Sequence, residues 1–157
     1  MKVYLDTTVI ILLLFGEKSQ PERHAEVIQL FAALDANRLQ AVVSLYALQE
    51  LCAFCFDNFP ADQSPRVARL AFHELLEHEL LIAPLLNRMD RIILSRRFPM
   101  EDTSDQVHAV TADKQGCEAI VTYDQHYQVI ADRIACLTAA DVLARLSAQQ
   151  NQEASAE

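Results

Sequence analysis

The stretch Val3-Tyr4-Leu5-Asp6-Thr7-Thr8-Val9-Ile10 places a short apolar strand directly before an aspartate and a helical run. A second stretch, Ala119-Ile120-Val121-Thr122-Tyr123-Asp124, repeats this order of apolar strand and aspartate. Short apolar segments alternate with longer helical patterns between the two. Strands joined by helices of this length pair in parallel through crossover connections. The sequence therefore predicts an α/β protein, a three-layer α/β/α sandwich with a mainly parallel central sheet.

The order of elements extends this prediction along the whole chain. The expected strands are 2–6, 40–44, 80–83, 119–122 and 135–137, and the expected helices are 7–15, 21–37, 45–56, 66–78, 86–97, 103–115 and 139–146. These elements form one domain over residues 1–147. Residues 148–157 carry no apolar stripe, so we expect them to form a disordered tail.

Composition limits the class of protein. The chain has 157 residues, of which 52% are hydrophobic, and a net charge of −9. That charge excludes a broad cationic surface that binds nucleic acid non-specifically, but it is compatible with a metal-binding acidic site. The longest apolar run, residues 9–15, is far shorter than the roughly 20 residues that span a bilayer. No secretory signal fits the N-terminus, so we expect a cytoplasmic protein with no membrane contact.

The cysteine pair Cys52 and Cys55 has the spacing of a zinc or redox motif. No second pair of cysteines or histidines completes a zinc set. Both cysteines also follow the apolar rhythm of a helix over residues 45–56, which favours plain core thiols.

Two aspartates stand at the carboxyl ends of predicted strands, where parallel sheets bind their ligands. Asp6 follows the first strand and Asp124 follows the fourth, so both belong to the same edge of the sheet. The alternative for each is a helix cap or a turn aspartate.

Further acids belong to two predicted helices. Glu50 is the only charge in residues 45–56, and a carboxylate on such an apolar helix is costly unless it is paired or bound to metal. A narrow solvent-facing stripe is the alternative. Asp102 and Asp105 lie at the start of the 103–115 helix. Asp102 suits the N-terminal cap, and Asp105 then occupies the third helical position.

Several carboxylates at one edge repel one another and therefore need a cation. Oxygen ligands favour Mg²⁺ or Mn²⁺. A metal in such a cleft polarises a phosphoryl oxygen and generates hydroxide, which indicates hydrolysis of phosphodiesters.

At this point the sequence resembles the PIN domain family, and within it the VapC-type ribonuclease toxins of toxin–antitoxin systems. The resemblance covers residues 2–147 and depends on the order of its motifs, because each motif alone is weak. The matching segments are 3–10, 44–51, 105–112, 119–127 and 137–143.

The resemblance implies a Mg²⁺- or Mn²⁺-dependent endoribonuclease that acts on RNA, is restrained by a small antitoxin protein and forms a homodimer. It implies that four acids are the catalytic, metal-binding residues: Asp6, Glu50, Asp105 and Asp124. Thr8 and Thr122 would be supporting hydroxyls, and Asp102 could share or replace Asp105 as the third acid.

Basic residues and histidines supply further candidates. Four arginines, Arg88, Arg91, Arg96 and Arg97, lie within ten residues and are candidates for RNA phosphate binding. The alternatives are an ordinary solvated helix face or contact with an acidic antitoxin tail. His108 is expected to make structural hydrogen bonds, and His126 to lie in a surface turn, although either could touch the site.

Two other functions remain open. One is a non-catalytic PIN-like binding module, and a related option is a housekeeping PIN ribonuclease without an antitoxin. The other is a phosphatase with an aspartate nucleophile, which would require a second aspartate that Asp6-Thr7-Thr8 lacks.

Overall fold

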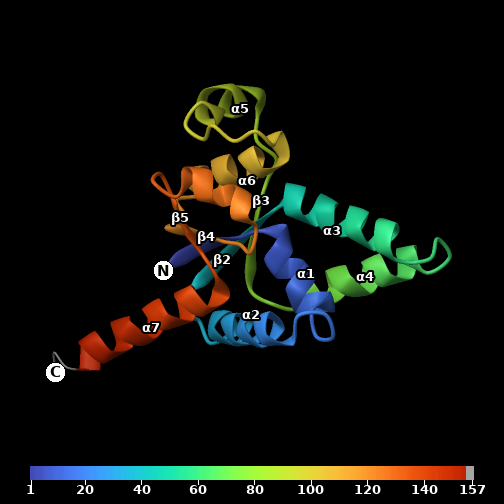
Figure 1. Ribbon diagram of the computed structural model, residues 1–157, viewed down its shortest axis with the longest axis horizontal. Helices are drawn as coiled ribbons and strands as arrows, with labels where there is room; N and C mark the ends of the chain where they lie inside the picture. Colours follow the sequence, from blue (N-terminus) through green and yellow to red (C-terminus); the bar gives the residue numbers. More distant parts are fainter. Residues whose placement is uncertain (155–157) are drawn as a thin grey trace.

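A fully parallel five-stranded sheet forms the centre of the protein (Figure 1). The computed structural model describes residues 1–154. The strand order is β3-β2-β1-β4-β5, and the strands are β1 Lys2–Leu5, β2 Gln40–Ser44, β3 Leu80–Ala83, β4 Ala119–Val121 and β5 Ala135–Leu137. Central strand β1 pairs with β2 on one side and with β4 on the other. The predicted α/β/α sandwich with a parallel sheet is confirmed.

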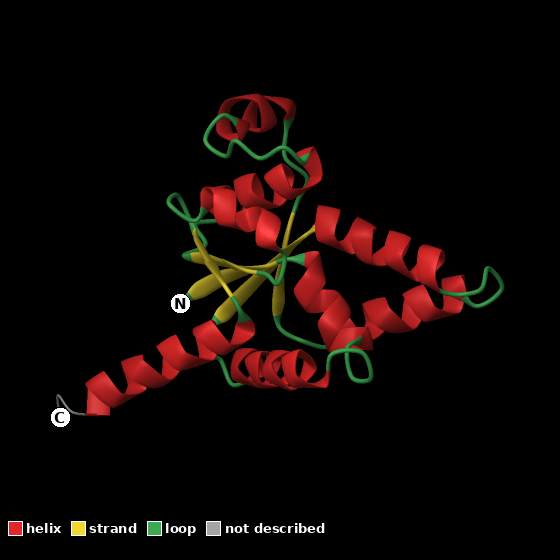
Figure 2. Ribbon diagram, viewed as in Figure 1, coloured by secondary structure: helices red, strands yellow, loops and turns green. Residues whose placement is uncertain are grey.

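Helices cover both faces of the sheet (Figure 2). They are α1 Thr7–Phe15, α2 Pro21–Asp35, α3 Leu45–Asn58, α4 Ser64–Leu75, α5 Arg88–Ser95, α6 Thr103–Lys114, the 3₁₀ helix η1 Gln125–Ile130 and α7 Ala139–Ala154. Figure 1 shows α1, α2 and α7 against one face, and α6 against the other with α5 beyond it. Helices α3 and α4 form an antiparallel pair that projects from the side of the sheet.

Alternating residues of the three central strands, β1, β2 and β4, face two separate cores. On β1, Val3 and Leu5 belong to the core beneath α1, α2, α3, α4 and α7. Tyr4, between them, points into the smaller core with Val110 of α6 and Ile130 of η1. Burial on both faces explains why the strands read as continuous apolar segments in the sequence.

Local sequence determines where helix α6 begins and ends. Asp102 caps its N-terminus and accepts from the Ser104 amide. At the other end, Gly116 has a φ of 65°, the left-handed conformation that glycine adopts without strain. The helix therefore starts and stops at defined points, and its C-terminal end lies at the amino end of β1, where Lys2 Nζ donates to the Gln115 carbonyl at 2.6 Å.

The C-terminal helix is longer than the sequence analysis predicts. Helix α7 runs through Ala154, whereas we expected it to end at Leu146 and to be followed by a disordered tail over 148–157. The prediction is wrong for residues 148–154, because good helix formers such as Ala, Gln and Glu propagate a helix already anchored on α2. The rest of the predicted tail, residues 155–157, lies outside the described residues. Among residues 1–154, no helix has the length and apolar character required to cross a membrane.

Candidate metal centre

Asp6 is held at the junction of β1 and α1 by four hydrogen bonds. Its Oδ2 accepts from the Thr8 amide at 3.3 Å, from Thr8 Oγ1 at 2.6 Å and from Thr122 Oγ1 at 2.9 Å. Its Oδ1 accepts from the Tyr127 hydroxyl at 3.1 Å. The residue is 4% exposed. The Asp6 carboxylate caps α1, and the four hydrogen bonds fix its orientation at the carboxyl edge of the sheet.

Asp124 stands beside Asp6 because β4 pairs with β1. Its backbone amide donates to Thr122 Oγ1 at 3.0 Å, the same hydroxyl that donates to Asp6. Its side chain caps η1 by accepting from the His126 amide at 2.9 Å. Thr122 therefore links the two strand-end aspartates. Each aspartate caps the helix that follows it, and both also lie at the same edge of the sheet.

Glu50 reaches the same edge from the second turn of α3. Its Oε2 accepts from the hydroxyl of Thr7 and from His108 Nε2, the latter at 3.1 Å. The side chain is 38% exposed, so it is neither buried alone nor simply solvated. Burial raises the pKa of Glu50, but the hydrogen bonds from His108 and from the Thr7 hydroxyl outweigh it and leave the pKa lowered. Hydrogen bonds from Thr7 and His108 therefore hold the Glu50 carboxylate in place.

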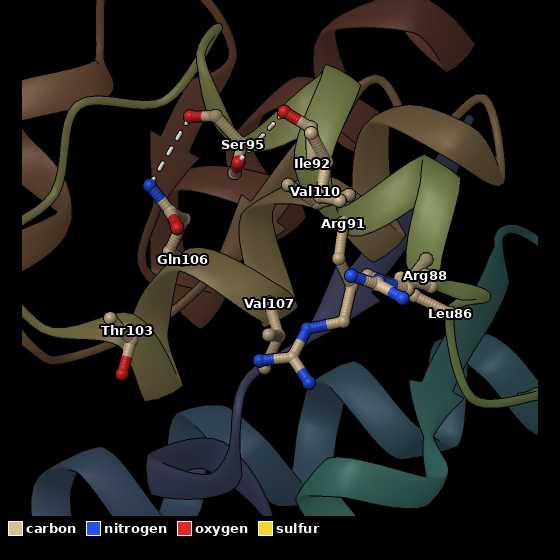
Figure 3. Close-up of a pocket in the computed structure, with 9 residues that line it drawn as sticks. All are labelled: Leu86, Arg88, Arg91, Ile92, Ser95, Thr103, Gln106, Val107 and Val110. Atoms are coloured by element: carbon tan, nitrogen blue, oxygen red, sulfur yellow. Dashed lines mark hydrogen bonds between the residues drawn. The ribbon is translucent and has the colours of Figure 1, made fainter.

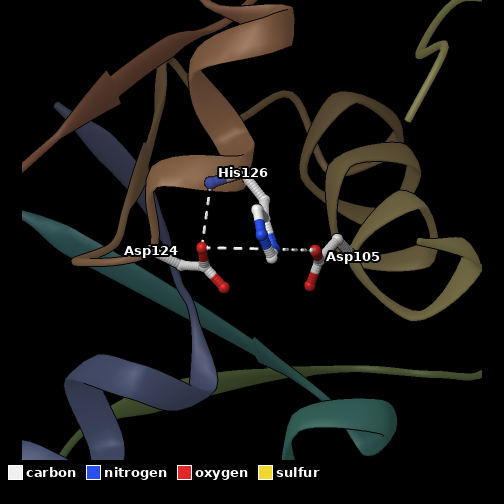
Figure 4. A group of neighbouring side chains, drawn as sticks. All are labelled: Asp105, Asp124 and His126. Atoms are coloured by element: carbon white, nitrogen blue, oxygen red, sulfur yellow. Dashed lines mark hydrogen bonds and ion pairs between the residues drawn. The ribbon is translucent and has the colours of Figure 1, made fainter. Parts of the chain in front are cut away.

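Asp105 and Asp124 face each other across the imidazole of His126 (Figure 4). His126 Nδ1 lies 3.6 Å from Asp105 Oδ2 and 3.5 Å from Asp124 Oδ1. One ligand atom from each of the three residues fits within 4.8 Å of the other two. Burial, reinforced by the nearby carboxylates of Asp102, Asp124 and Asp6, raises the pKa of Asp105 to about 6.

Asp102 and Asp105 differ in their surroundings although one helical turn separates them. The Asp102 carboxylate is occupied as the cap of α6 and accepts from the Ser104 amide and hydroxyl, both at 2.7 Å. These bonds lower the pKa of Asp102. The Asp105 side chain is 16% exposed and faces Asp124, so the geometry favours Asp105 over Asp102 as the third acid.

The predicted arginine cluster divides into two parts. Arg88 and Arg91 of α5 line a cavity of about 540 Å³ opposite Thr103 and Gln106 of α6 (Figure 3). Arg91 and Thr103 also line an adjoining cavity of about 300 Å³ that includes Glu50.

The other two arginines are not brought to this cavity. Arg97 pairs with Asp113 at 2.6 Å. Arg96 is exposed at the end of α5.

Several groups of the site escaped sequence reasoning. Thr7 and Tyr127 contact Glu50 and Asp6 directly. Tyr4 and Ser44 form a buried hydrogen-bonded chain that ends at His108, which makes the structural hydrogen bonds expected of it. A tyrosine in the middle of an otherwise aliphatic buried strand was the available signal for Tyr4, because its hydroxyl requires a partner. His126 was expected in a surface turn, and it is exposed there while also contacting both aspartates.

The donor set fits a divalent cation. The Asp105 and Asp124 carboxylates lie close to each other and to the imidazole of His126. Burial, followed by repulsion from the neighbouring carboxylates, raises the pKa of Asp105. Oxygen donors suit Mg²⁺ or Mn²⁺, and an imidazole nitrogen beside them is accepted more readily by Mn²⁺.

Comparisons with known proteins identify the fold. The PIN domain family model matches residues 2–126, so the chain belongs to the PIN domain family, as the sequence analysis predicts. No curated protein sequence matches the chain significantly.

Solved structures of similar fold include a VapC toxin and several VapBC structures. VapC20 of Mycobacterium tuberculosis, described as a toxin that cleaves the sarcin–ricin loop, has 15% identity and a TM-score of 0.61 over 84% of this chain and 95% of its own. VapBC2 from Rickettsia felis, bound to a promoter DNA fragment, has 14% identity and a TM-score of 0.61 over 88% and 98%. VapBC-1 from nontypeable Haemophilus influenzae has 22% identity and a TM-score of 0.57 over 89% and 99%. At these identities the likeness shows the fold alone.

Proposed function

We propose that this PIN domain protein is a metal-dependent endoribonuclease, with Asp6, Glu50, Asp105 and Asp124 as its acidic residues and Mg²⁺ or Mn²⁺ as its cofactor. One observation carries the proposal: the Asp105 and Asp124 carboxylates and the imidazole of His126 lie close enough to share one ion, and burial together with the neighbouring acids raises the pKa of Asp105 to about 6. A site that concentrates uncompensated carboxylates in this way is stabilised by a divalent cation.

The residues of the site would have different roles in hydrolysis. Asp105 and Asp124 would hold the cation, with Asp6 and Glu50 beside them. The bound metal would supply Lewis-acid activation of the phosphate and of a water molecule. Thr8, Thr122 and Tyr127 fix the Asp6 carboxylate, and Thr7 and His108 fix that of Glu50. Preorganised carboxylates need no rearrangement when the reaction begins.

RNA would approach along α5 and α6. Arg91 borders the cavity that contains Glu50, and Arg88 borders the adjoining cavity. Guanidinium groups bind phosphate oxygens in two-pronged hydrogen bonds, which would draw the strand toward the acids. Arg96 and Arg97 would contribute less, since Arg97 already pairs with Asp113.

We also propose that the protein is a toxin restrained by a small antitoxin. Several of the structurally similar proteins are VapBC complexes, and the α3–α4 pair exposes Phe56 and Leu70, which are 52% and 57% exposed. Such apolar side chains are suited to bind a partner. A homodimer and a cytoplasmic location remain predictions, and gel filtration with light scattering would test the dimer.

The decisive experiment is cleavage of a mixed RNA panel by purified, partner-free protein. We expect cleavage with Mg²⁺ or Mn²⁺, loss with EDTA, and loss in Asp6→Asn. Asp57→Asn, which removes an exposed charge at the far end of α3, is the matched control and should cleave normally. Absence of cleavage with either metal, from a folded sample, would instead favour a non-catalytic binding module.

A further inference from the structure

A buried chain of four side chains runs from β2 through β1 to the Glu50 carboxylate. Ser44 Oγ and the Tyr4 hydroxyl lie 2.6 Å apart, and the Tyr4 hydroxyl lies 2.5 Å from His108 Nδ1. His108 Nε2 lies 3.1 Å from Glu50 Oε2. Ser44, Tyr4 and His108 are each at most 1% exposed. Residues from β2, β1 and α6 therefore form one hydrogen-bonded chain, whose last member, His108, contacts the Glu50 carboxylate.

The direction of these hydrogen bonds follows from the donors available. Ser44 Oγ accepts from the Ala47 amide at 3.1 Å, and among the described residues its own hydrogen has the Tyr4 hydroxyl as acceptor. Tyr4 keeps its proton because burial raises its pKa, and its hydroxyl therefore donates to His108 Nδ1. The imidazole then carries its hydrogen on Nε2 and donates to Glu50. In this arrangement every donor of the chain has an acceptor, as buried polar groups require.

The chain acts on one oxygen of Glu50 only. Both the His108 bond and the Thr7 bond are accepted by Oε2. Oε1 has no hydrogen-bond partner among the described residues, and Glu50 lines the cavity shared with Arg91 and Thr103. One face of the carboxylate is thus anchored, while the other remains available to the cleft.

We infer that His108 is a positioning residue: in its Nε2–H form, set by Tyr4 and Ser44, it holds Glu50 so that Oε1 faces the metal and the substrate. This inference rests on the proposed function for the identity of the metal site. Carboxylates and imidazoles that orient ligands from behind commonly change metal affinity or turnover 10- to 100-fold when they are removed. A merely structural His108 would change stability without changing metal binding.

Two substitutions separate these possibilities because amide side chains mimic the two ring nitrogens differently. In His108→Gln the amide nitrogen reaches the position of Nε2 and keeps a donor for Glu50. In His108→Asn the shorter side chain reaches only the position of Nδ1 and loses that donor. Both variants remove the ring, so they cost similar packing against Tyr4 and Tyr46.

The first measurement is binding of Mn²⁺ to each folded variant, followed by electron paramagnetic resonance. We expect His108→Asn to weaken Mn²⁺ binding at least 10-fold, and His108→Gln to stay within about 3-fold of wild type. On RNA, the Asn variant should lose kcat with little change in KM. Equal Mn²⁺ affinity in both variants, whether reduced or normal, would overturn the positioning assignment.

Thr111→Val is the matched control for loss of a buried hydrogen bond on the same helix. Thr111 is 1% exposed and donates to the Val107 carbonyl at 2.7 Å, outside the chain to Glu50. It should lower thermal stability and leave Mn²⁺ binding unchanged. A loss of Mn²⁺ binding as large as that of His108→Asn would contradict the inference.

A second measurement uses the wild-type protein and needs no variant to fold. Nitrogen-15 NMR distinguishes the two neutral forms of histidine from the doubly protonated one. At neutral pH we expect His108 to have a protonated Nε2 and an unprotonated Nδ1, and a proton on Nδ1 would overturn the inference. Neither measurement depends on RNA cleavage, so an inactive wild-type protein would remove the proposed function while leaving the test of His108 intact.

Discussion

The Thr122 hydroxyl donates to Asp6 Oδ2 over 2.9 Å and accepts from the Asp124 amide over 3.0 Å. One hydroxyl thereby joins the ends of β1 and β4 and sets the relative position of two aspartates that are far apart in the sequence. This bond exists because β4 pairs with β1 in register, with Leu5 opposite Val121. The pairing of β1 with β4 therefore determines the relative positions of Asp6 and Asp124 in the acidic site.

Thr122→Val should remove this link while preserving the shape of the side chain. The buried Asp6 carboxylate would lose a charge-assisted hydrogen bond, and we expect a cost of about 1–3 kcal/mol in the free energy of unfolding. Thr122→Ser keeps the hydroxyl and should lose much less. Urea unfolding of the metal-free proteins measures both, and a valine variant as stable as the serine variant would contradict the assigned bond.

Asp105 should make stability depend on pH in the absence of metal. Its pKa is raised to about 6 in the folded protein, against about 3.9 in an unfolded chain. The folded state therefore binds more protons between about pH 4 and 6, so the contribution of Asp105 to stability is lost as pH rises through this range. Above it, the ionised carboxylate is destabilising.

Asp105→Asn should accordingly raise the Tm of the EDTA-treated protein by a few degrees at pH 7.5 and by little near pH 4. The measurement is thermal unfolding at both pH values. Added Mn²⁺ should stabilise the wild type more than the variant, because the cation relieves the same repulsion. An unchanged Tm at pH 7.5 would show that Asp105 is not under strain from its neighbours.

The order of the elements could be predicted from the sequence because apolar periodicity and capping residues are local signals. Asp6 and Asp124 could also be chosen locally, since parallel strands end at one edge, whereas the sequence left the choice between Asp102 and Asp105 open. The partners of Glu50 could not be chosen this way: Thr7 and His108 are 43 and 58 residues from it, and their approach depends on how α3 and α6 pack. Helix α7 beyond Leu146 was missed because its polar residues carry no periodic signal, although they have adequate helix propensity.

Removal of the side-chain charge should have very different effects on RNA cleavage at Asp102 and at Asp105. Asp102→Asn keeps a competent helix cap and removes only an exposed charge, so RNA cleavage should stay within a few-fold of wild type. Asp105→Asn removes a carboxylate that faces Asp124, and cleavage should fall at least 100-fold. Rates under saturating Mn²⁺ provide the comparison. A larger loss for Asp102→Asn would make Asp102 the third acid.

Arg91 and Arg97 provide a matched test of the path proposed for RNA. Each substitution by alanine removes one positive charge, so the net charge of the two variants is the same. Arg91 borders the cavity that contains Glu50, whereas Arg97 is already paired with Asp113 at the surface. We expect Arg91→Ala to weaken RNA binding several-fold and to reduce the dependence of binding on salt, because one phosphate contact is lost.

Arg97→Ala should leave RNA affinity unchanged and cost less than about 1 kcal/mol of stability, as is typical of exposed ion pairs. Binding is measured by fluorescence anisotropy in an Asp6→Asn background with EDTA, so that the RNA is not cleaved. Arg88→Ala, which changes the neighbouring cavity, should fall between the two. If Arg97→Ala weakened binding as much as Arg91→Ala, general charge rather than the α5–α6 cavity would be guiding the RNA, and the proposed path would be wrong.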